Sequence, residues 1–301
     1  MRYTAFSYRE RYGLRLQRLV LDGGFTCPNR DGTVGYGGCT FCDNAAFHPA
    51  YTHGKTITEQ IEAGVAFHQR RKGEVDGYLA YFQAYSSTYA PLETLKARYE
   101  EALSHPRVHG IVIGTRPDCV DRNILDYLSE IKERGYIVEV EYGIESVHDE
   151  TLRRVNRGHD FACTREAVMA TGQKGIPVGG HIILGLPGEG RDQILASASV
   201  LNDLPLSYLK IHQLQILKGT TMEKEYLEKP EDFLRLGPDD YVELLADFLE
   251  RLRPEIAIAR IVSSVPPPFT NCPWGLLKQD ELLRRLDKCL EARGTKQGCL
   301  S

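Results

Sequence analysis

Residues 16–42 read LQRLVLDGGFTCPNRDGTVGYGGCTFC, a short apolar run followed by a glycine-rich loop that holds three cysteines. The run 16–21 predicts a β-strand. Cys39 and Cys42 form a C-x-x-C pair, and the glycines between them and Cys27 make the loop flexible enough to bring all three thiols together. Three thiols clustered directly after a strand predict a metal centre.

Outward from this loop, β-rich runs alternate with amphipathic stretches at intervals of roughly thirty residues, a pattern typical of repeated βα units around a parallel sheet. The predicted strands are residues 16–21, 78–82, 110–114, 137–142, 178–184 and 208–216. The predicted helices between them are residues 58–71, 92–104, 122–134, 163–174 and 192–204. The sequence therefore predicts an α/β fold.

The rhythm changes after the sixth strand. A charged segment leads to a helix at 238–251, a strand at 256–262 and a last amphipathic helix at 278–292. No Gly/Ser-rich linker separates this part from the rest. We expect residues 1–220 to form a core with an N-terminal segment and residues 221–301 to form an α/β extension packed on it.

Composition excludes several classes of protein. With 42% hydrophobic residues and 37 basic against 41 acidic side chains, the chain lies in the globular range, so disorder, collagen and coiled coil are excluded. No run approaches the roughly 20 apolar residues of a membrane-spanning helix, and the N-terminus lacks the apolar core of a signal peptide. We expect a cytoplasmic protein. Eight cysteines are too few for a disulfide scaffold, which leaves metal binding or chemistry for the cluster.

Two kinds of metal centre fit three thiols. One is structural zinc with His48 or His53 as the fourth ligand. The other is a [4Fe–4S] cluster with one iron left open for a substrate or cofactor. The loop follows the first strand, at the end of a barrel where active sites lie, and this placement favours the cluster.

Six ordered blocks carry a resemblance to a known family. They are CPNRDGTVGYGGCTFC (27–42), FQAYSSTYAP (82–91), IGTRPDCV (113–120), EYGIESVHDETLRRVNRGHDF (141–161), GHIILGLPGE (180–189) and LKIHQLQILKGT (209–220), with RGTKQG (293–298) near the C-terminus. In this order they resemble the radical S-adenosylmethionine (radical SAM) superfamily, in the subgroup near the elongator-type enzymes and oxygen-independent coproporphyrinogen oxidases. The resemblance implies a partial (β/α)6 TIM-like barrel.

The resemblance also implies the cofactors and the reaction class. Cys27, Cys39 and Cys42 would be ligands of a [4Fe–4S] cluster whose fourth iron is chelated by S-adenosylmethionine. Reductive cleavage of S-adenosylmethionine would give a 5′-deoxyadenosyl radical that abstracts hydrogen from the substrate. An electron donor such as flavodoxin or ferredoxin is implied as a partner.

Cofactor-binding residues are expected at the ends of the strands. By resemblance they are Phe41, Gln83, Ser86, Glu145, Ser146, Arg157, Leu184, Gly185 and Leu186. Arg157 resembles an arginine that pairs with the cofactor carboxylate, and a solvated surface arginine is its alternative. Gln83 and Ser86 stand where many relatives carry a glycine-rich triplet. His181 reads more simply as a core histidine, and Arg116 and Asp118 either line the pocket or pair with each other.

The elongator-type resemblance implies a substrate, the wobble uridine of tRNA, with its carboxymethylaminomethyl group trimmed to aminomethyl. Two basic patches suit RNA: an N-terminal one in which Arg2, Arg9, Arg11, Arg15 and Arg18 alternate with aromatic residues, and the run 70–72. Packing of an amphipathic N-terminal segment on the barrel explains the first patch equally well. Alternatives are a radical SAM enzyme acting on a small-molecule or porphyrin-like substrate, and a non-catalytic zinc-binding module.

Overall fold

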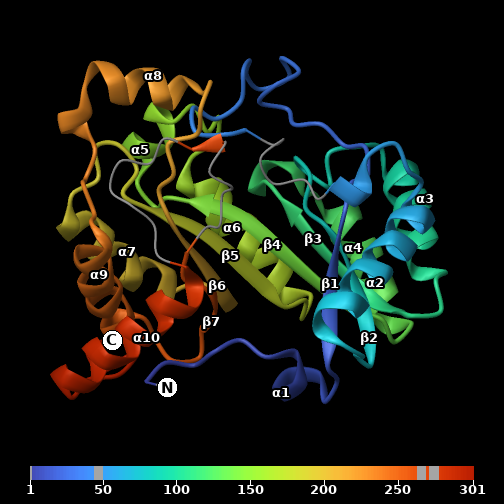
Figure 1. Ribbon diagram of the computed structural model, residues 1–301. Coiled ribbons are helices and arrows are strands. Elements are labelled where there is room, and N and C mark those ends of the chain that lie inside the picture. The colour runs from blue at the N-terminus through green and yellow to red at the C-terminus, as the bar shows by residue number, and fades with distance from the viewer. Residues whose placement is uncertain (1, 44–49, 263–268, 271–277) are drawn as a thin grey trace.

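The computed structural model describes residues 2–43, 50–262, 269–270 and 278–301, and these residues form one seven-stranded parallel sheet in the order β1 to β7. The strands are β1 (Leu16–Leu21), β2 (Gly77–Phe82), β3 (Val108–Thr115), β4 (Ile137–Glu145), β5 (Val178–Leu184), β6 (Leu206–Gln213) and β7 (Ala257–Arg260). The sheet curls into a half-barrel with β1 and β7 at its two edges (Figure 1). The predicted α/β partial barrel is confirmed, and the strand expected at 256–262 extends the same sheet.

The helices are α1 (Tyr8–Tyr12), α2 (Ile57–Lys72), α3 (Leu92–Leu103), α4 (Arg122–Glu133), α5 (Asp149–Arg154), α6 (Phe161–Gln173), α7 (Arg191–Asn202), α8 (Thr221–Glu228), α9 (Pro238–Arg251) and α10 (Gln279–Arg293). Most of them cover the outer, convex face of the sheet, whereas α1 lies at the end where the strands begin and α8 at the opposite end (Figure 1). The seven helices predicted from periodicity are all present, whereas α1, α5 and α8 were not predicted. No helix in the described ranges is long and apolar enough to cross a membrane.

The two faces of each strand have different roles, because successive side chains point to opposite sides. On β1, Leu19 and Leu21 are fully buried and belong to the large apolar core under the helices. Their neighbours Arg18 and Val20 line the concave side. The core between helices and sheet therefore holds the half-barrel rigid, and the concave side is left free to carry polar groups.

The N-terminal segment closes the end of the half-barrel at which the strands begin. The hydroxyls of Tyr8 and Tyr12 donate hydrogen bonds to the carboxylate of Glu139 on β4, at 3.2 and 2.8 Å. Tyr3 is buried in the core. The C-terminus holds this segment, since the Gln297 backbone N–H donates to the Arg2 carbonyl at 2.8 Å and its side-chain oxygen accepts from the Thr4 N–H at 2.9 Å.

Candidate active site

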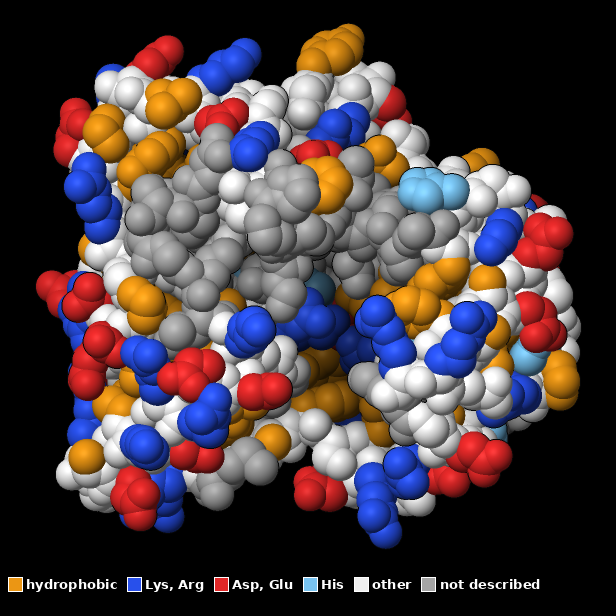
Figure 2. Space-filling view, viewed as in Figure 1, with side chains coloured by type: hydrophobic (Ala, Val, Ile, Leu, Met, Phe, Trp, Pro, Cys, Tyr) orange, Lys and Arg blue, Asp and Glu red, His pale blue; other side chains and the backbone are white. Residues whose placement is uncertain are grey.

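A cavity of about 1050 Å³ occupies the concave side of the sheet. Residues from all seven strands line it, together with the cysteine loop and one face of α2. Its mouth is visible as a hollow in the middle of the face shown in Figure 2, where Lys and Arg side chains gather. Single small-molecule pockets span roughly 300–1,000 Å³. The cavity therefore has room for a cofactor and a part of a second molecule.

The cysteine loop lies at the cavity, and Cys27, Cys39 and Cys42 all line it. Gly37 and Gly38, directly before Cys39, have φ angles of 79° and 82°, which glycine adopts without the steric cost of a Cβ. The loop therefore depends on these two glycines for the path that brings Cys39 back to the strand end.

Two donors surround the sulfur of Cys39. A guanidinium nitrogen of Arg157 (Nη1) lies 3.5 Å from this sulfur, and the amide nitrogen of Asn29 lies 3.8 Å from it. Burial lowers the pKa of Arg157, but the charges of Cys39 and Glu145 outweigh burial and hold it above the usual value. A thiolate at Cys39 is thus met by a permanent positive charge and hydrogen-bond donors.

Backbone strain concentrates at the same end of the barrel. The non-glycine residues with positive φ in the described part of the chain are Tyr85 (57°), Glu145 (62°) and Asn156 (53°). They lie in the loop after β2, at the end of β4 and directly before Arg157. Such conformations cost of order 1–3 kcal/mol each and cluster where a site requires a particular geometry. Two of these residues, Tyr85 and Glu145, line the cavity.

The end of β4 brings Glu145 and Arg157 together. Arg157 donates from Nη2 to the Gly143 carbonyl at 2.6 Å, and the same nitrogen lies 3.8 Å from the Glu145 carboxylate. A Cβ on Gly143 would lie 2.5 Å from the Glu145 carboxylate and 2.8 Å from Arg157 Nη2. Glycine at 143 therefore permits this close approach.

The structure gathers most of the residues predicted to bind the cofactor at the cavity, but not all. Phe41, Gln83, Ser86, Glu145 and Arg157 line it. Ser146 instead donates to the buried carboxylate of Glu189 and lies outside the lining.

The predicted cofactor-binding residues at the end of β5 also lie outside the cavity lining. Leu184, Gly185 and Leu186 are buried at the end of β5 and lie outside the cavity lining, although the neighbouring Ile183 belongs to it. Because the side chains of these three residues lie outside the cavity wall, a role in cofactor binding would depend on their backbone groups.

Sequence reasoning missed a polar cluster in the middle of the half-barrel. The Lys210 ammonium on β6 donates to Glu141 on β4 at 2.7 Å and to the Tyr81 hydroxyl on β2 at 3.1 Å. His181, expected to be a core histidine, contacts Glu141 at 2.9 Å and lines the cavity. Arg18 donates to the second oxygen of the same carboxylate. Charged residues within β-strands that otherwise read as apolar were the available signal.

Comparison with known proteins settles the family. The model of the radical SAM superfamily matches residues 27–201. The chain belongs to the radical SAM superfamily. A second family model, the radical SAM C-terminal domain, matches residues 206–290.

Relatives match this radical SAM protein over nearly its whole length. The uncharacterized protein YtqA of Bacillus subtilis is 42% identical over 303 residues, which cover 99% of this chain and 92% of YtqA. Protein YhcC of Escherichia coli is 38% identical over 290 residues, which cover 96% of this chain and 92% of YhcC.

Among solved structures, the archaeal Elp3 of Methanocaldococcus infernus shares the fold. It superimposes with a TM-score of 0.71 at 16% identity, over 94% of this chain and 64% of the Elp3 chain. The radical SAM protein described here therefore spans just under two thirds of that Elp3 chain.

Radical SAM enzymes use a [4Fe–4S] cluster and S-adenosylmethionine, and these are the cofactors of this protein. The residues present fit such groups. Arg116 Nη1 and Arg157 Nε are buried and lack a hydrogen-bond partner among the described residues, although both side chains line the cavity. Buried polar atoms are nearly always hydrogen-bonded, so both positions suit an anionic group such as a carboxylate.

The contacts of Arg116 decide between its two predicted roles, lining the pocket or pairing with Asp118. Arg116 pairs with Asp118 through two hydrogen bonds of 2.8 and 2.7 Å, so the salt bridge between them is present. Arg116 nevertheless lines the cavity and donates a further bond to the Arg157 carbonyl at 2.8 Å. It therefore supports Arg157 as well as pairing with Asp118.

Membership of the radical SAM superfamily decides against the zinc-binding module. Within the described ranges, no three Cys, His, Asp or Glu side chains converge as the ligands of one metal ion do. His48 lies outside the described residues. A [4Fe–4S] cluster does not require its cysteines to converge on one metal ion, because each thiolate binds a separate iron.

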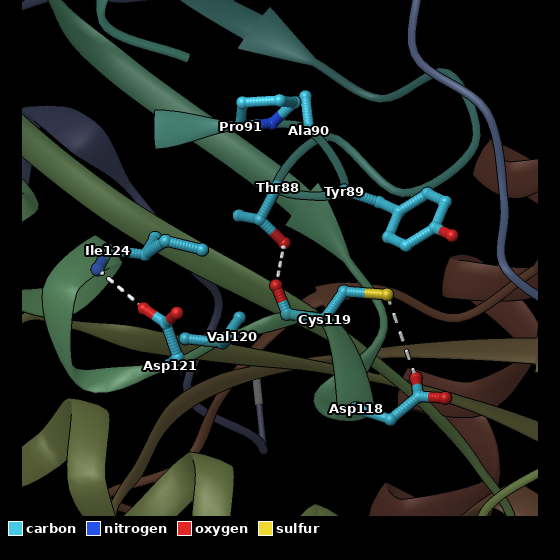
Figure 3. Close-up of a pocket in the computed structure, with 9 residues that line it drawn as sticks. All are labelled: Thr88, Tyr89, Ala90, Pro91, Asp118, Cys119, Val120, Asp121 and Ile124. Atoms are coloured by element: carbon cyan, nitrogen blue, oxygen red, sulfur yellow. Dashed lines mark hydrogen bonds between the residues drawn. The ribbon is translucent and has the colours of Figure 1, made fainter. Parts of the chain in front are cut away.

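A second cavity, of about 550 Å³, lies beside the first between the loops that follow β2 and β3 (Figure 3). Thr88 donates to the Cys119 carbonyl across it at 2.6 Å, and Asp121 accepts from the Ile124 N–H at 2.9 Å. Burial raises the pKa of the Cys119 thiol to about 12. Cys119 is therefore a neutral thiol at physiological pH and a poor nucleophile.

Proposed function

We propose that this protein is a cytoplasmic radical SAM enzyme that acts on tRNA and shortens the carboxymethylaminomethyl group of a wobble uridine to aminomethyl. The choice of uridine derives from the resemblance of the motif blocks to elongator-type enzymes. The choice of RNA has support from the rim of the cavity.

A stack of aromatic and arginine side chains at the rim of the cavity is the observation that carries the proposal. The Arg71 guanidinium lies 4.4 Å from the ring centre of Phe67, and the Phe67 ring lies 5.7 Å from that of Tyr51. All three line the cavity, and Phe67 is 38% exposed. Aromatic rings and arginine planes bind unstacked bases of single-stranded RNA, such as those of an anticodon loop.

The N-terminal patch contributes less than its composition suggested. Tyr8, Tyr12 and Arg18 are used inside the protein, where they surround Glu139. Of the basic residues, Arg9, Arg11 and Arg15 stay exposed, although Arg11 also lies 3.9 Å from the Glu139 carboxylate. Packing on the barrel therefore explains most of this segment, and α2 provides the better RNA surface. A net charge of −4 agrees with a small contact area, because phosphate contacts need cations.

In this proposal Cys27, Cys39 and Cys42 hold the cluster, and Glu145 and Arg157 bind S-adenosylmethionine. When bound, these cofactors would supply the 5′-deoxyadenosyl radical, which would take a hydrogen atom from the methylene of the carboxymethyl group. With S-adenosylmethionine as the two-electron oxidant, the oxidised C–N bond would be hydrolysed by water, so that the two carbons leave as glyoxylate and the amine stays on the uridine. Arg157 orients the methionine carboxylate with its unpartnered Nε, and Glu145 accepts hydrogen bonds from the ammonium or the ribose. The closed end of the half-barrel, at Tyr8 and Tyr12, excludes water from below.

The test uses anaerobically purified protein with its cluster, S-adenosylmethionine, dithionite and tRNA that carries carboxymethylaminomethyl uridine. Mass spectrometry of the nucleosides is expected to show this uridine disappear and aminomethyl uridine appear. Formation of 5′-deoxyadenosine without any change in the tRNA would contradict the tRNA substrate and favour a small-molecule or porphyrin-like one. A flavodoxin or ferredoxin is the proposed donor in the cell, and should replace dithionite in the assay.

A further inference from the structure

The middle of the half-barrel holds charged side chains that the cofactor sites do not use. Lys210 and Glu141 are 8% and 1% exposed, so both are buried beneath the strand ends. The Tyr81 hydroxyl donates to Glu141 at 2.6 Å and accepts from Lys210. Burying charges is costly unless they are paired, and these residues line the cavity. The cluster is therefore a built feature of the cavity wall.

When Lys210 is protonated, positive charge exceeds negative charge in this cluster. In the described part of the chain, the cationic side chains on its strands are Arg18, Lys210 and Arg260, and the carboxylates are Glu139 and Glu141. Arg18 bridges both carboxylates, and Lys210 pairs with Glu141 alone. One cation remains without a counter-charge.

The unpaired cation is Arg260, on the edge strand β7. Arg260 is the register partner of Lys210 on β6, so both side chains project from the same face of the sheet. Both line the cavity. Among the residues the structure describes, the Arg260 side chain forms no hydrogen bond or ion pair within 4 Å. A guanidinium in this position is free to bind an anion that enters the cavity.

We infer that Lys210 and Arg260 form a binding site for a carboxylate of the substrate, set one layer below the strand ends. The inference rests on the proposed function, in which the substrate group ends in a carboxylate and the product ends in an ammonium. A carboxylate completes the charge balance of the cluster. The ammonium of the product adds a further positive charge beside Lys210 and Arg260 and is repelled. The site therefore separates substrate from product by the sign of one charge.

The test compares two anticodon hairpins that differ only at the wobble uridine, which carries carboxymethylaminomethyl in one and aminomethyl in the other. Binding to the cluster-loaded protein with S-adenosylmethionine, without reductant, is measured by fluorescence anisotropy. We expect wild-type protein to bind the carboxylate hairpin about tenfold more tightly, since one charge-assisted hydrogen bond corresponds to roughly that factor.

Variants at Arg260 provide the sharpest readout, because this side chain is exposed and has no hydrogen-bond or ion-pair partner among the described residues. Arg260→Gln is expected to bring the affinity ratio of the two hairpins close to one, and Arg260→Glu to invert it. Arg122→Gln is the matched control, since Arg122 is 89% exposed on α4 and does not line the cavity. It should leave the ratio unchanged. Lys210→Gln should reduce the ratio as well, with folding checked by circular dichroism.

A wild-type ratio near one, or an Arg260→Gln variant that keeps the wild-type ratio, overturns the carboxylate site. Absence of binding to either hairpin overturns it too. Failure of the proposed function is separately visible, because the same carboxylate hairpin with dithionite then stays unmodified in the mass spectrum. An equal affinity for both hairpins together with normal conversion rejects the carboxylate site and leaves the proposed function standing.

Discussion

The guanidinium of Arg157 lies 3.5 Å from the sulfur of Cys39, although 118 residues separate them in the chain. The same side chain donates to the Gly143 carbonyl at the end of β4. Arg157 thus joins the proposed cluster loop after β1 to the proposed cofactor site at β4. This contact links the two halves of a site that the sequence presents as distant motifs.

Replacement of Arg157 is expected to weaken cofactor binding without emptying the cluster site. Arg157→Gln removes the charged donor for the methionine carboxylate, and one such contact is worth about 1.5–3 kcal/mol, or roughly 10- to 150-fold in affinity for S-adenosylmethionine. Equilibrium dialysis and iron analysis measure the two effects. Arg153→Gln, an exposed neighbour, is the control. Unchanged affinity in Arg157→Gln would contradict the assignment.

Alanine at Cys27, Cys39 or Cys42 is expected to abolish the brown colour of anaerobically purified protein and reduce iron to background. Alanine at Cys119 or Cys163 should leave about four irons per chain, the content of one [4Fe–4S] cluster. Both lie outside the wall of the large cavity. Retention of full iron content by any of the first three variants would remove that residue from the ligand set.

Two substitutions at Glu145 separate its backbone strain from its carboxylate. Glu145→Gly relieves the positive φ of 62°, and we expect a melting temperature about 2 °C above that of Glu145→Gln. Both variants should lose affinity for S-adenosylmethionine, because both lack the carboxylate. Calorimetry and dialysis provide the readouts. The idea fails if the glutamine variant binds the cofactor normally.

The rim of the cavity is expected to contribute to RNA affinity alone. Phe67→Ala should weaken binding of an anticodon hairpin by about 1–3 kcal/mol, the usual worth of one base stacked on an aromatic ring. Cleavage of S-adenosylmethionine in the absence of RNA should continue at the wild-type rate, because Phe67 lies on α2 and belongs neither to the cysteine loop nor to the strand ends proposed to bind the cofactors. Met169→Ala is a control, since Met169 is similarly exposed on α6. Equal loss in both variants would argue against the stacking role.

Stability should depend on pH through Lys210. Burial lowers the pKa of Lys210 from 10.5 to about 7. Between these values the unfolded chain holds a proton that the folded protein has released, so stability rises with pH across this window. The charged or titratable groups that face Lys210 are Arg18, Tyr81, Glu141, His181, His212 and Arg260.

Urea unfolding at pH 7 and pH 9 tests this dependence. The rise in the free energy of unfolding of the wild type should exceed that of Lys210→Met, in which the group is absent. Since the other titrating groups are common to both proteins, the difference reports on Lys210. Parallel changes in the two proteins would show that Lys210 has an ordinary pKa.

The scaffold was predictable from sequence, because its strands are short apolar runs separated by amphipathic stretches. Every predicted strand lies in the sheet. The short helices α5 and α8 were missed, because six and eight residues give too little periodicity to recognise. The cysteine loop was recognisable because its residues are adjacent in the chain.

The carboxylate site escaped prediction for a different reason. Its residues come from separate strands, and only the curl of the sheet brings Lys210, Glu141 and Arg260 to one cavity. In β4, Glu139 and Glu141 alternate with Val138 and Val140 in a strand that is buried on both sides. A carboxylate at every second position of a buried parallel strand indicates a polar interior, and this signal was present in the sequence.

The side chain of Gln297 has a consequence for how the protein can be altered. Its amide nitrogen donates to the carbonyls of Arg253 and Ile256 at 3.0 Å, beside β7, while its backbone and side-chain oxygen hold the N-terminal segment. The residues around Gln297 therefore hold in place the N-terminal segment that closes one end of the half-barrel. Loss of this tail, far from Cys27, Cys39 and Cys42 in the chain, should release Tyr8 and Tyr12 and admit solvent to the cavity.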